Sequence, residues 1–152
     1  MKKLLEKFLE KGLTLGSVES MTGGLFAGAF TDVPGASKVF KGSIVTYASE
    51  IKENVVGVKK ETIEKYSVVS EQVAREMAEC GRKLLNVDVC VSVTGNAGPT
   101  CEPGGKPAGC FYVAIATKND TFVEVFQINK KRNGVRNGAV LAMRDMLYLK
   151  TI

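Results

Sequence analysis

A short apolar segment that ends in a serine and runs straight into paired glycines constrains the fold of this chain most strongly. The segment reads Ser17-Val18-Glu19-Ser20-Met21-Thr22-Gly23-Gly24-Leu25. It predicts a strand over residues 13–19 that passes through a tight turn into a helix over residues 22–31. At such a turn the serine hydroxyl lies at the rim of a sheet, and the free N–H groups of the next helix point at a neighbouring anion. Ser20 is therefore either a nucleophile beside its anion stabiliser or a simple helix cap, with the glycines allowing close packing.

The chain contains no histidine, which limits how Ser20 could be activated. The serine-histidine-carboxylate relay needs an imidazole base. A lysine, a tyrosine or a carboxylate must therefore take the hydroxyl proton. A lysine suits this role where burial or neighbouring positive charge lowers its pKa toward neutrality.

Tyr47 and Lys52 lie at and just beyond the end of another predicted strand, over residues 39–48. Tyr47 stands at the end of that strand and Lys52 begins the next element, so both side chains could return to the Ser20 loop. A tyrosine hydroxyl can position a proton or stabilise charge, and a lysine amine is a plausible base for Ser20. The alternatives are the common fates of such residues: a solvated helix position for Lys52 and a half-buried core aromatic for Tyr47.

A second glycine-rich loop spans residues 94–109, directly after a buried-looking strand predicted over residues 87–94. In open α/β sheets, ligands bind beyond the carboxyl ends of strands, so the two loops could form one pocket. The loop lacks the glycine-lysine-serine/threonine ending of a Walker loop and does not match GxGxxG, so a nucleoside triphosphate or a dinucleotide is not indicated. The alternative is that its glycines and prolines only shape a long surface turn.

In the rest of the chain, segments with apolar residues at helical spacing alternate with segments that have the pattern of strands. Helices are predicted over residues 2–11, 49–56, 61–66 and 134–149, with a longer helix that begins at a Ser70 cap, and strands over residues 109–117 and 121–128, joined by a hairpin-type turn. A chain of 152 residues fits one compact domain. We therefore expect a single α/β domain over residues 1–152, built as three α/β/α layers around a mixed sheet.

The net charge of +5 does not indicate a nucleic-acid partner, because the basic residues are spread along the chain. The clearest cluster is Lys130, Lys131, Arg132 and Arg136, which fits a small anionic ligand or, alternatively, a solvated basic turn before the last helix. The sequence shows no signal-like or transmembrane-length apolar run, so we expect a cytoplasmic protein without a membrane partner. The four cysteines lack CxxC spacing, so reduced thiols and no structural metal are expected.

Several ordered blocks of this sequence together resemble the C-terminal domain of the competence/damage-inducible protein A family, whose members include nicotinamide mononucleotide deamidases. The blocks are VESMTGG at 18–24, PGASKVFKGSIVTY at 34–47, Lys52 with Gly57-Val58, Val69-Ser70, TGNAGP at 94–99, and Gly104-Gly105-Lys106-Pro107 with Gly109. The sequence departs from the usual family pattern at Met21, Ser49, Asn96 and Thr100–Pro103. The chain contains no counterpart of the N-terminal nucleotide-processing domain of longer members, which implies a stand-alone amidohydrolase.

The resemblance implies hydrolysis of the carboxamide of nicotinamide mononucleotide to nicotinic acid mononucleotide and ammonia, with no metal or organic cofactor. By position, Ser20 is the implied nucleophile, Lys52 its base and Tyr47 a catalytic support. The implied substrate-binding residues are Thr22, Gly23, Gly24, Ser37, Thr94, Gly95, Arg132 and Arg136. Backbone N–H groups at Thr22, Gly23 and Gly24 would stabilise the oxyanion or, alternatively, hold the phosphate. Either arginine could bind the phosphate or order the site.

Two other classes of function stay open from the residues alone. One is a nucleotide-binding regulatory module that keeps the pocket without turnover, and the other is a partner-binding domain whose loops are structural. Retention of Ser20, Tyr47 and Lys52 favours the enzyme. The oligomeric state is not determined by the sequence, and a homo-oligomer is compatible with it.

Overall fold

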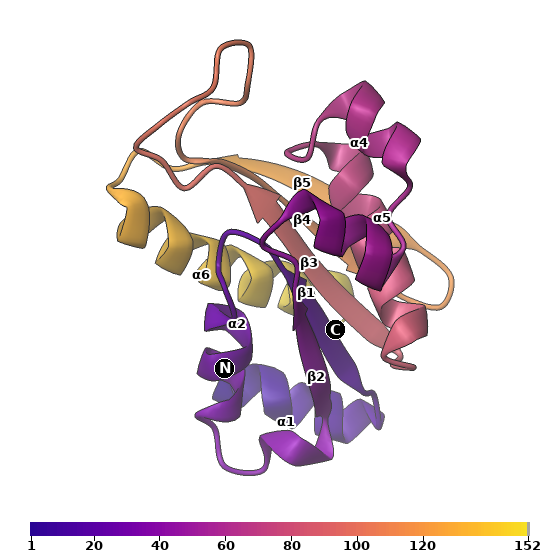
Figure 1. Cartoon of the computed structure of the whole chain (residues 1–152). Coiled ribbons are helices and arrows are strands. Elements are labelled where there is room, and N and C mark those ends of the chain that lie inside the picture. The colour runs from indigo at the N-terminus through magenta and orange to yellow at the C-terminus, as the bar shows by residue number, and fades with distance from the viewer. Residues whose placement is uncertain (152) are drawn as a thin grey trace.

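The computed structural model describes residues 1–151 and contains a five-stranded mixed sheet (Figure 1). The strands are β1 (Leu15–Glu19), β2 (Phe40–Val45), β3 (Val89–Gly95), β4 (Cys110–Ala116) and β5 (Thr121–Gln127), in the spatial order β2-β1-β3-β4-β5. The central strand β1 is parallel to β2 and β3, whereas β4 is antiparallel to both β3 and β5. The prediction of a mixed sheet is confirmed.

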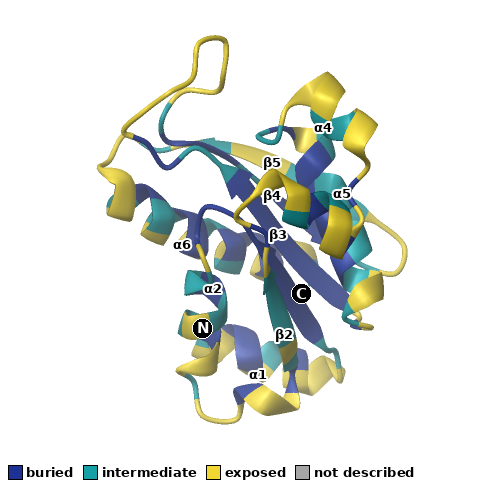
Figure 2. Cartoon of the chain, viewed as in Figure 1, coloured by how far each residue is buried: buried dark blue, intermediate teal, exposed yellow. Residues whose placement is uncertain are grey.

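Helices cover both faces of the sheet, which confirms the three-layer α/β/α architecture (Figure 1). They are α1 (Lys2–Lys11), α2 (Leu25–Thr31), η1 (Ala36–Lys38), α3 (Ser49–Ile51), η2 (Lys52–Val56), α4 (Lys60–Tyr66), α5 (Glu71–Leu84) and α6 (Arg132–Thr151). The larger apolar cluster joins α1, α2 and α6 to one face, and smaller clusters join α5 to the other. Figure 2 shows the central strands as buried, in agreement with the continuous burial of β1.

Local sequence signals account for most element boundaries. Ser70 caps α5 as predicted, because its Oγ accepts a hydrogen bond from the Val73 N–H at 3.2 Å. The helix predicted over residues 22–31 begins later, at Leu25, because Gly23 and Gly24 take positive φ angles and form a turn. No helix within residues 1–151 is long and apolar enough to cross a membrane.

The helix predicted over residues 49–56 is divided into α3 and the π-helix η2, which begins at Lys52. The Lys52 carbonyl accepts hydrogen bonds from the N–H groups of both Gly57 and Val58, at 3.0 and 2.9 Å. These bonds span five and six residues, so the backbone turn is wider than in an α-helix. Lys52 is the first residue of this widened turn.

The parallel pairing of three neighbouring strands brings their carboxyl ends to one edge of the sheet. Ser20 follows β1 directly, and Gly95 ends β3, so the two glycine-rich loops meet at this edge. The segment that leads from β2 to Lys52 leaves from the same edge. The fold thus assembles three sequence segments at the position where open α/β sheets bind ligands.

Substitutions at two helical glycines, Gly81 in α5 and Gly28 in α2, test how tightly α5 packs on the sheet. A methyl group added at Gly81 of α5 would overlap Val18 Cγ2 and lie 3.1 Å from Cys90 Sγ, whereas one added at Gly28 of α2 meets no heavy atom within 4 Å. We expect Gly81→Ala to lower the free energy of unfolding by about 1–3 kcal/mol through overpacking. Gly28→Ala should raise it by about 0.5–1 kcal/mol through helix propensity. Urea denaturation measures both, and a stabilised Gly81→Ala protein would contradict the close packing described for α5.

Candidate active site

Ser20 lies at the tip of β1, where the backbone turns toward α2. Its N–H donates to the Val93 carbonyl of β3 at 3.1 Å, which anchors the residue at the end of the central strands. The residue is 8% exposed, and it lines a pocket of about 280 Å³. The other lining residues are Met21, Tyr47, Ser49, Lys52, Val68, Val69, Thr94, Gly95, Asn96, Ala97 and Arg132. The two glycine-rich loops therefore share one pocket.

Lys52 is in direct contact with Ser20, although 31 residues separate them in the sequence. The Lys52 Nζ lies 3.0 Å from Ser20 Oγ and donates a second hydrogen bond of 2.7 Å to the Thr46 carbonyl. Only 2% of Lys52 is exposed, so it is not the solvated helix residue of the alternative interpretation. Burial lowers the pKa of its amine from an ordinary value of 10.5 to about 8. A minority of the amine, roughly a tenth near pH 7, is then neutral, and a neutral amine can accept the Ser20 proton.

Thr94 and Gly95, at the end of β3, also line the pocket. The Thr94 hydroxyl donates to the Val68 carbonyl at 2.7 Å, which connects β3 to the segment that precedes α5. A Cβ at Gly95 would overlap Phe111 Cβ and lie 2.6 Å from Met21 Sδ. Gly95 therefore permits the close approach of the second loop to the Ser20 turn. Both residues line the pocket that also contains Ser20.

Tyr47 and Arg132 pair at the rim of the pocket. Tyr47 is 64% exposed, so it is not a half-buried core aromatic. Arg132 donates to the Tyr47 hydroxyl at 3.0 Å and to the Gly98 carbonyl at 2.7 Å. These contacts hold a guanidinium at the mouth of the pocket, with further N–H donors left for an anion.

Arg136 is placed differently from Arg132, because it does not line this pocket. Its Nε donates to the Met21 carbonyl at 2.9 Å, and its terminal nitrogen donates to the Thr22 carbonyl at 3.0 Å. The guanidinium thus clamps the backbone of the turn that carries Ser20. The sequence did not distinguish the roles of the two arginines, whereas the structure does. Arg132 lines the pocket, and Arg136 supports the turn that carries Ser20.

The structure does not leave the predicted N–H groups of Gly23 and Gly24 available for a ligand. The Gly23 N–H donates to the Ser20 carbonyl at 3.1 Å, and the Gly24 N–H donates to a carboxylate oxygen of Glu19 at 3.2 Å. The Thr22 side chain also turns to Glu19, at 2.7 Å. Within residues 1–151, the backbone N–H groups of Met21 and Thr22 make no hydrogen bond. Of the three predicted donors, only the Thr22 N–H is therefore unpaired, and Thr22 is fully buried next to the pocket-lining residue Met21.

Ser37 lies far from this pocket along the sheet. It belongs to η1, which precedes β2, whereas Ser20 follows the parallel strand β1. Residues before and after parallel strands lie at opposite edges of the sheet. The structure therefore places the exposed Ser37 at the other end of the sheet and does not bring it together with Ser20.

Two residues that the sequence analysis gave no role shape the site. Asn96 organises the second loop, because its amide donates to the carbonyls of Thr100 and Lys106 and its oxygen accepts from the Gly98 N–H. Glu19 is fully buried beside Ser20 and accepts hydrogen bonds from the start of α2. The sequence signal for Glu19 was present: an acidic residue directly before a turn into a helix complements the positive end of the helix dipole.

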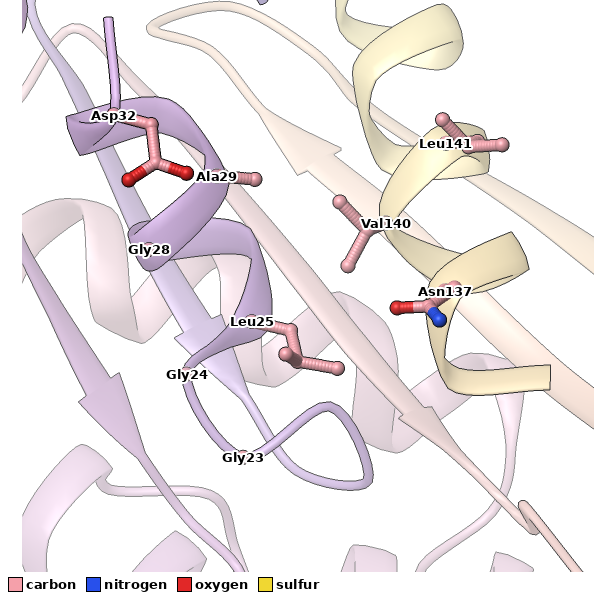
Figure 3. Close-up of a pocket in the computed structure, with 9 residues that line it drawn as sticks. All are labelled: Gly23, Gly24, Leu25, Gly28, Ala29, Asp32, Asn137, Val140 and Leu141. Carbon is pink, nitrogen blue, oxygen red and sulfur yellow. The ribbon is translucent and has the colours of Figure 1, made fainter. Parts of the chain in front are cut away.

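A larger hollow lies between α2 and α6, beside the Gly23-Gly24 turn (Figure 3). It is lined by Gly23, Gly24, Leu25, Gly28, Ala29, Asp32, Asn137, Val140 and Leu141. The figure shows mostly apolar side chains there, and neither Ser20 nor Lys52 belongs to its wall. Over the described part of the chain, no group of three or more His, Cys, Asp or Glu side chains could hold a metal ion. Ser20 and Lys52 line the smaller pocket instead.

Comparisons with known proteins agree with the fold. A family model described as the CinA C-terminal domain matches residues 1–150. A relative from Thermoanaerobacter sp. (strain X514), named as a competence-damage inducible protein, is 45% identical over 148 residues, which are 97% of this chain and 36% of the relative. A CinA-like protein from Flavobacterium psychrophilum is 42% identical over 139 residues, 91% of this chain and 33% of that protein. The chain thus spans about a third of the length of these curated relatives.

Solved structures are similar over almost the whole chain. A competence/damage inducible protein from Agrobacterium tumefaciens has a TM-score of 0.94 and 31% sequence identity, covering 97% of this chain and 91% of that one. The competence damage-inducible protein A from Klebsiella pneumoniae has a TM-score of 0.96 and 28% identity, covering 99% and 93%. The three-layer architecture is therefore shared with experimentally determined structures.

The burial of Lys52 predicts a specific pH dependence of stability. The folded protein releases the Lys52 proton above pH 8, whereas the unfolded chain holds it up to 10.5. In that window the unfolded state binds more protons, so the free energy of unfolding should rise with pH. Relative to Lys52→Met, the wild type should gain about 3 kcal/mol across the window. Urea denaturation of both proteins at a series of pH values measures this gain, and parallel curves would show that Lys52 is not desolvated.

Proposed function

The chain belongs to the family of the CinA C-terminal domain, and on this premise we propose that it hydrolyses the carboxamide of nicotinamide mononucleotide. The products are nicotinic acid mononucleotide and ammonia. One observation carries the proposal: the buried amine of Lys52 lies 3.0 Å from Ser20 Oγ in a pocket open to a ligand. A nucleophile within hydrogen-bond reach of a base with a lowered pKa is the arrangement required for covalent catalysis of acyl transfer.

The reaction follows from that pair of groups. Ser20 Oγ attacks the amide carbon while the neutral Lys52 amine takes the hydroxyl proton, and the carbonyl oxygen becomes an oxyanion. Lys52 then gives the proton to the amide nitrogen, the C–N bond breaks, and ammonia leaves an ester on Ser20. Water, deprotonated by the neutral amine, attacks this ester, and the proton returns to Ser20 Oγ as the carboxylic acid is released. Protons balance over the cycle, and one water is consumed.

The backbone N–H groups of Met21 and Thr22 are the proposed oxyanion donors. They follow the nucleophile directly and make no hydrogen bond within residues 1–151. The residue after the nucleophile also supplies a donor in α/β-hydrolases, where the serine likewise follows a strand. Arg136 holds the Met21 carbonyl, which shares a peptide group with the Thr22 N–H, and the Gly23 N–H holds the Ser20 carbonyl, which shares a peptide group with the Met21 N–H. Removing one such donor typically costs about 3 kcal/mol in transition-state stabilisation.

Arg132 is the proposed partner of the nucleotide phosphate. Among the two candidate arginines it alone lines the pocket, and its contacts to Tyr47 and Gly98 fix its position without neutralising its charge. A guanidinium can bind a phosphate through two parallel N–H groups. In this assignment Tyr47 acts on the substrate through Arg132, since its hydroxyl contacts that guanidinium.

Removing the nucleophile should abolish turnover. We expect Ser20→Ala to reduce ammonia release from nicotinamide mononucleotide by about 10³-fold or more, in the presence of a chelator. Ser49→Ala is the matched control, because it removes another hydroxyl from the wall of the same pocket. Thermal melts establish that each variant is folded. Saturable nucleotide binding by the wild type without ammonia release would select the regulatory module instead, and equal turnover by Ser20→Ala would exclude Ser20 as the nucleophile.

The two arginines should respond differently to the same substitution. Arg132→Gln removes a charged hydrogen-bond donor to the phosphate, so KM should rise by about 10–100-fold with little change in kcat. Arg136→Gln loosens the Ser20 turn, so kcat should fall more than KM rises. With nicotinamide riboside, which has no phosphate, Arg132→Gln should lose its effect on KM. Steady-state kinetics with both substrates measure this, and an equal KM effect on both would remove Arg132 from the phosphate site.

A further inference from the structure

Glu19 is a buried acid that the proposed reaction does not use. It is the last residue of β1 and the neighbour of Ser20, and it has no measurable exposure to solvent. Burying a carboxylate is costly unless hydrogen bonds replace its hydration. Hydrogen bonds within the protein must therefore satisfy the Glu19 carboxylate.

Neutral donors, rather than a cation, satisfy the Glu19 carboxylate. One oxygen accepts from the Thr22 hydroxyl at 2.7 Å and from the N–H groups of Gly24 and Phe26 at 3.2 and 3.0 Å. The other accepts from the Ala27 N–H at 2.9 Å and from the Ser43 hydroxyl at 3.2 Å. Glu19 thus takes up the unpaired N–H groups at the start of α2 and connects them to β2.

The backbone of Glu19 also leads to the proposed base. Its carbonyl accepts a hydrogen bond of 2.7 Å from the Thr46 N–H. The Thr46 carbonyl in turn accepts the 2.7 Å hydrogen bond from Lys52 Nζ. One residue therefore fixes the turn that carries Ser20 through its side chain, and the segment that holds Lys52 through its main chain.

We propose that Glu19 is a positioning residue that holds Ser20 Oγ at the Lys52 amine by acting as a built-in anion at the start of α2; this inference rests on the proposed function. The carboxylate does not line the Ser20 pocket and contacts neither Ser20 Oγ nor Lys52 Nζ. It therefore transfers no proton in the reaction. Because it occupies the N–H groups of the α2 turn, the substrate phosphate binds elsewhere, in agreement with the assignment to Arg132.

Chemical rescue tests the anion directly and needs no substrate. Glu19→Ala should melt at a lower temperature than the wild type, because the N–H groups of α2 lose their partner. Formate, the smallest carboxylate, can occupy the vacated space and so stabilise the folded variant. We expect formate to raise the Tm of Glu19→Ala but not that of the wild type, and chloride at equal ionic strength to raise neither. Equal formate shifts in both proteins would overturn the proposal.

Steady-state kinetics distinguish a role of Glu19 in positioning Ser20 from a role in stability alone. In Glu19→Ala, kcat should fall about 100-fold through misplacement of Ser20, with KM changed by less than about threefold, and formate should restore part of kcat. Glu76→Ala is the matched control, because Glu76 accepts from the Lys59 N–H and the Thr62 hydroxyl at the start of α4, away from the pocket. It should lower the Tm and leave kcat unchanged. An unchanged kcat in folded Glu19→Ala would overturn the proposal.

A substrate-independent probe distinguishes failure of this inference from failure of the proposed function. Phenylmethanesulfonyl fluoride sulfonylates activated serines, and mass spectrometry gives the rate of labelling at Ser20. Wild type that is labelled but releases no ammonia would reject the substrate, while slower labelling of Glu19→Ala, recovered by formate, would support the role of Glu19. No labelling of the wild type, or equal rates in both proteins, would overturn it. If Glu19→Ala does not fold, the same rates are compared for Glu19→Gln.

Discussion

Two buried ionisable side chains, which are kept apart from each other, govern the structure around the pocket. Among residues 1–151, Glu19 and Lys52 are the acidic and basic side chains that are almost fully buried, and they do not pair with each other. A contact between them would favour the charged amine and raise the pKa of Lys52. Instead, neutral N–H and hydroxyl groups satisfy Glu19, while Lys52 meets only Ser20 and a backbone carbonyl. The Glu19 carboxylate thus stabilises the turn that carries Ser20. Because it does not contact Lys52, it does not oppose the effect of burial, which lowers the pKa of the Lys52 amine to about 8.

The sheet topology makes that separation possible. Parallel pairing of β1 with β2 and β3 brings the end of each strand to one edge, where Ser20, the segment leading to Lys52, and Thr94-Gly95 meet. From this edge Glu19 points into the start of α2, and Lys52 approaches from the other side through the π-helix η2. The last helix then closes the arrangement, because Arg132 reaches the pocket mouth and Arg136 the back of the turn.

Much of the fold could be predicted from local patterns. Alternating and helical periodicities placed all five strands and the main helices, and the Ser70 cap of α5 is confirmed. The π-helix at Lys52 could not be predicted in this way, because it depends on Gly57 and Val58 sharing one carbonyl in the folded chain. Only some of the predicted site residues lie where a role in the pocket requires. Ser20 and Lys52 lie together as the resemblance implied, whereas the N–H groups of Gly23 and Gly24 are already paired, and Ser37 lies at the opposite end of the sheet.

Residue identity and short-range spacing were enough to predict the strand, turn and helix around Ser20, the absence of an imidazole base and the order of the secondary-structure elements. The folded chain was needed to place the Lys52 amine against Ser20 and to show that Arg132 rather than Arg136 faces the pocket. The physical reason is that hydrogen-bond partners and desolvation are set by groups close in space, and here those groups come from β1, β2, η2 and α6, which are distant in the chain.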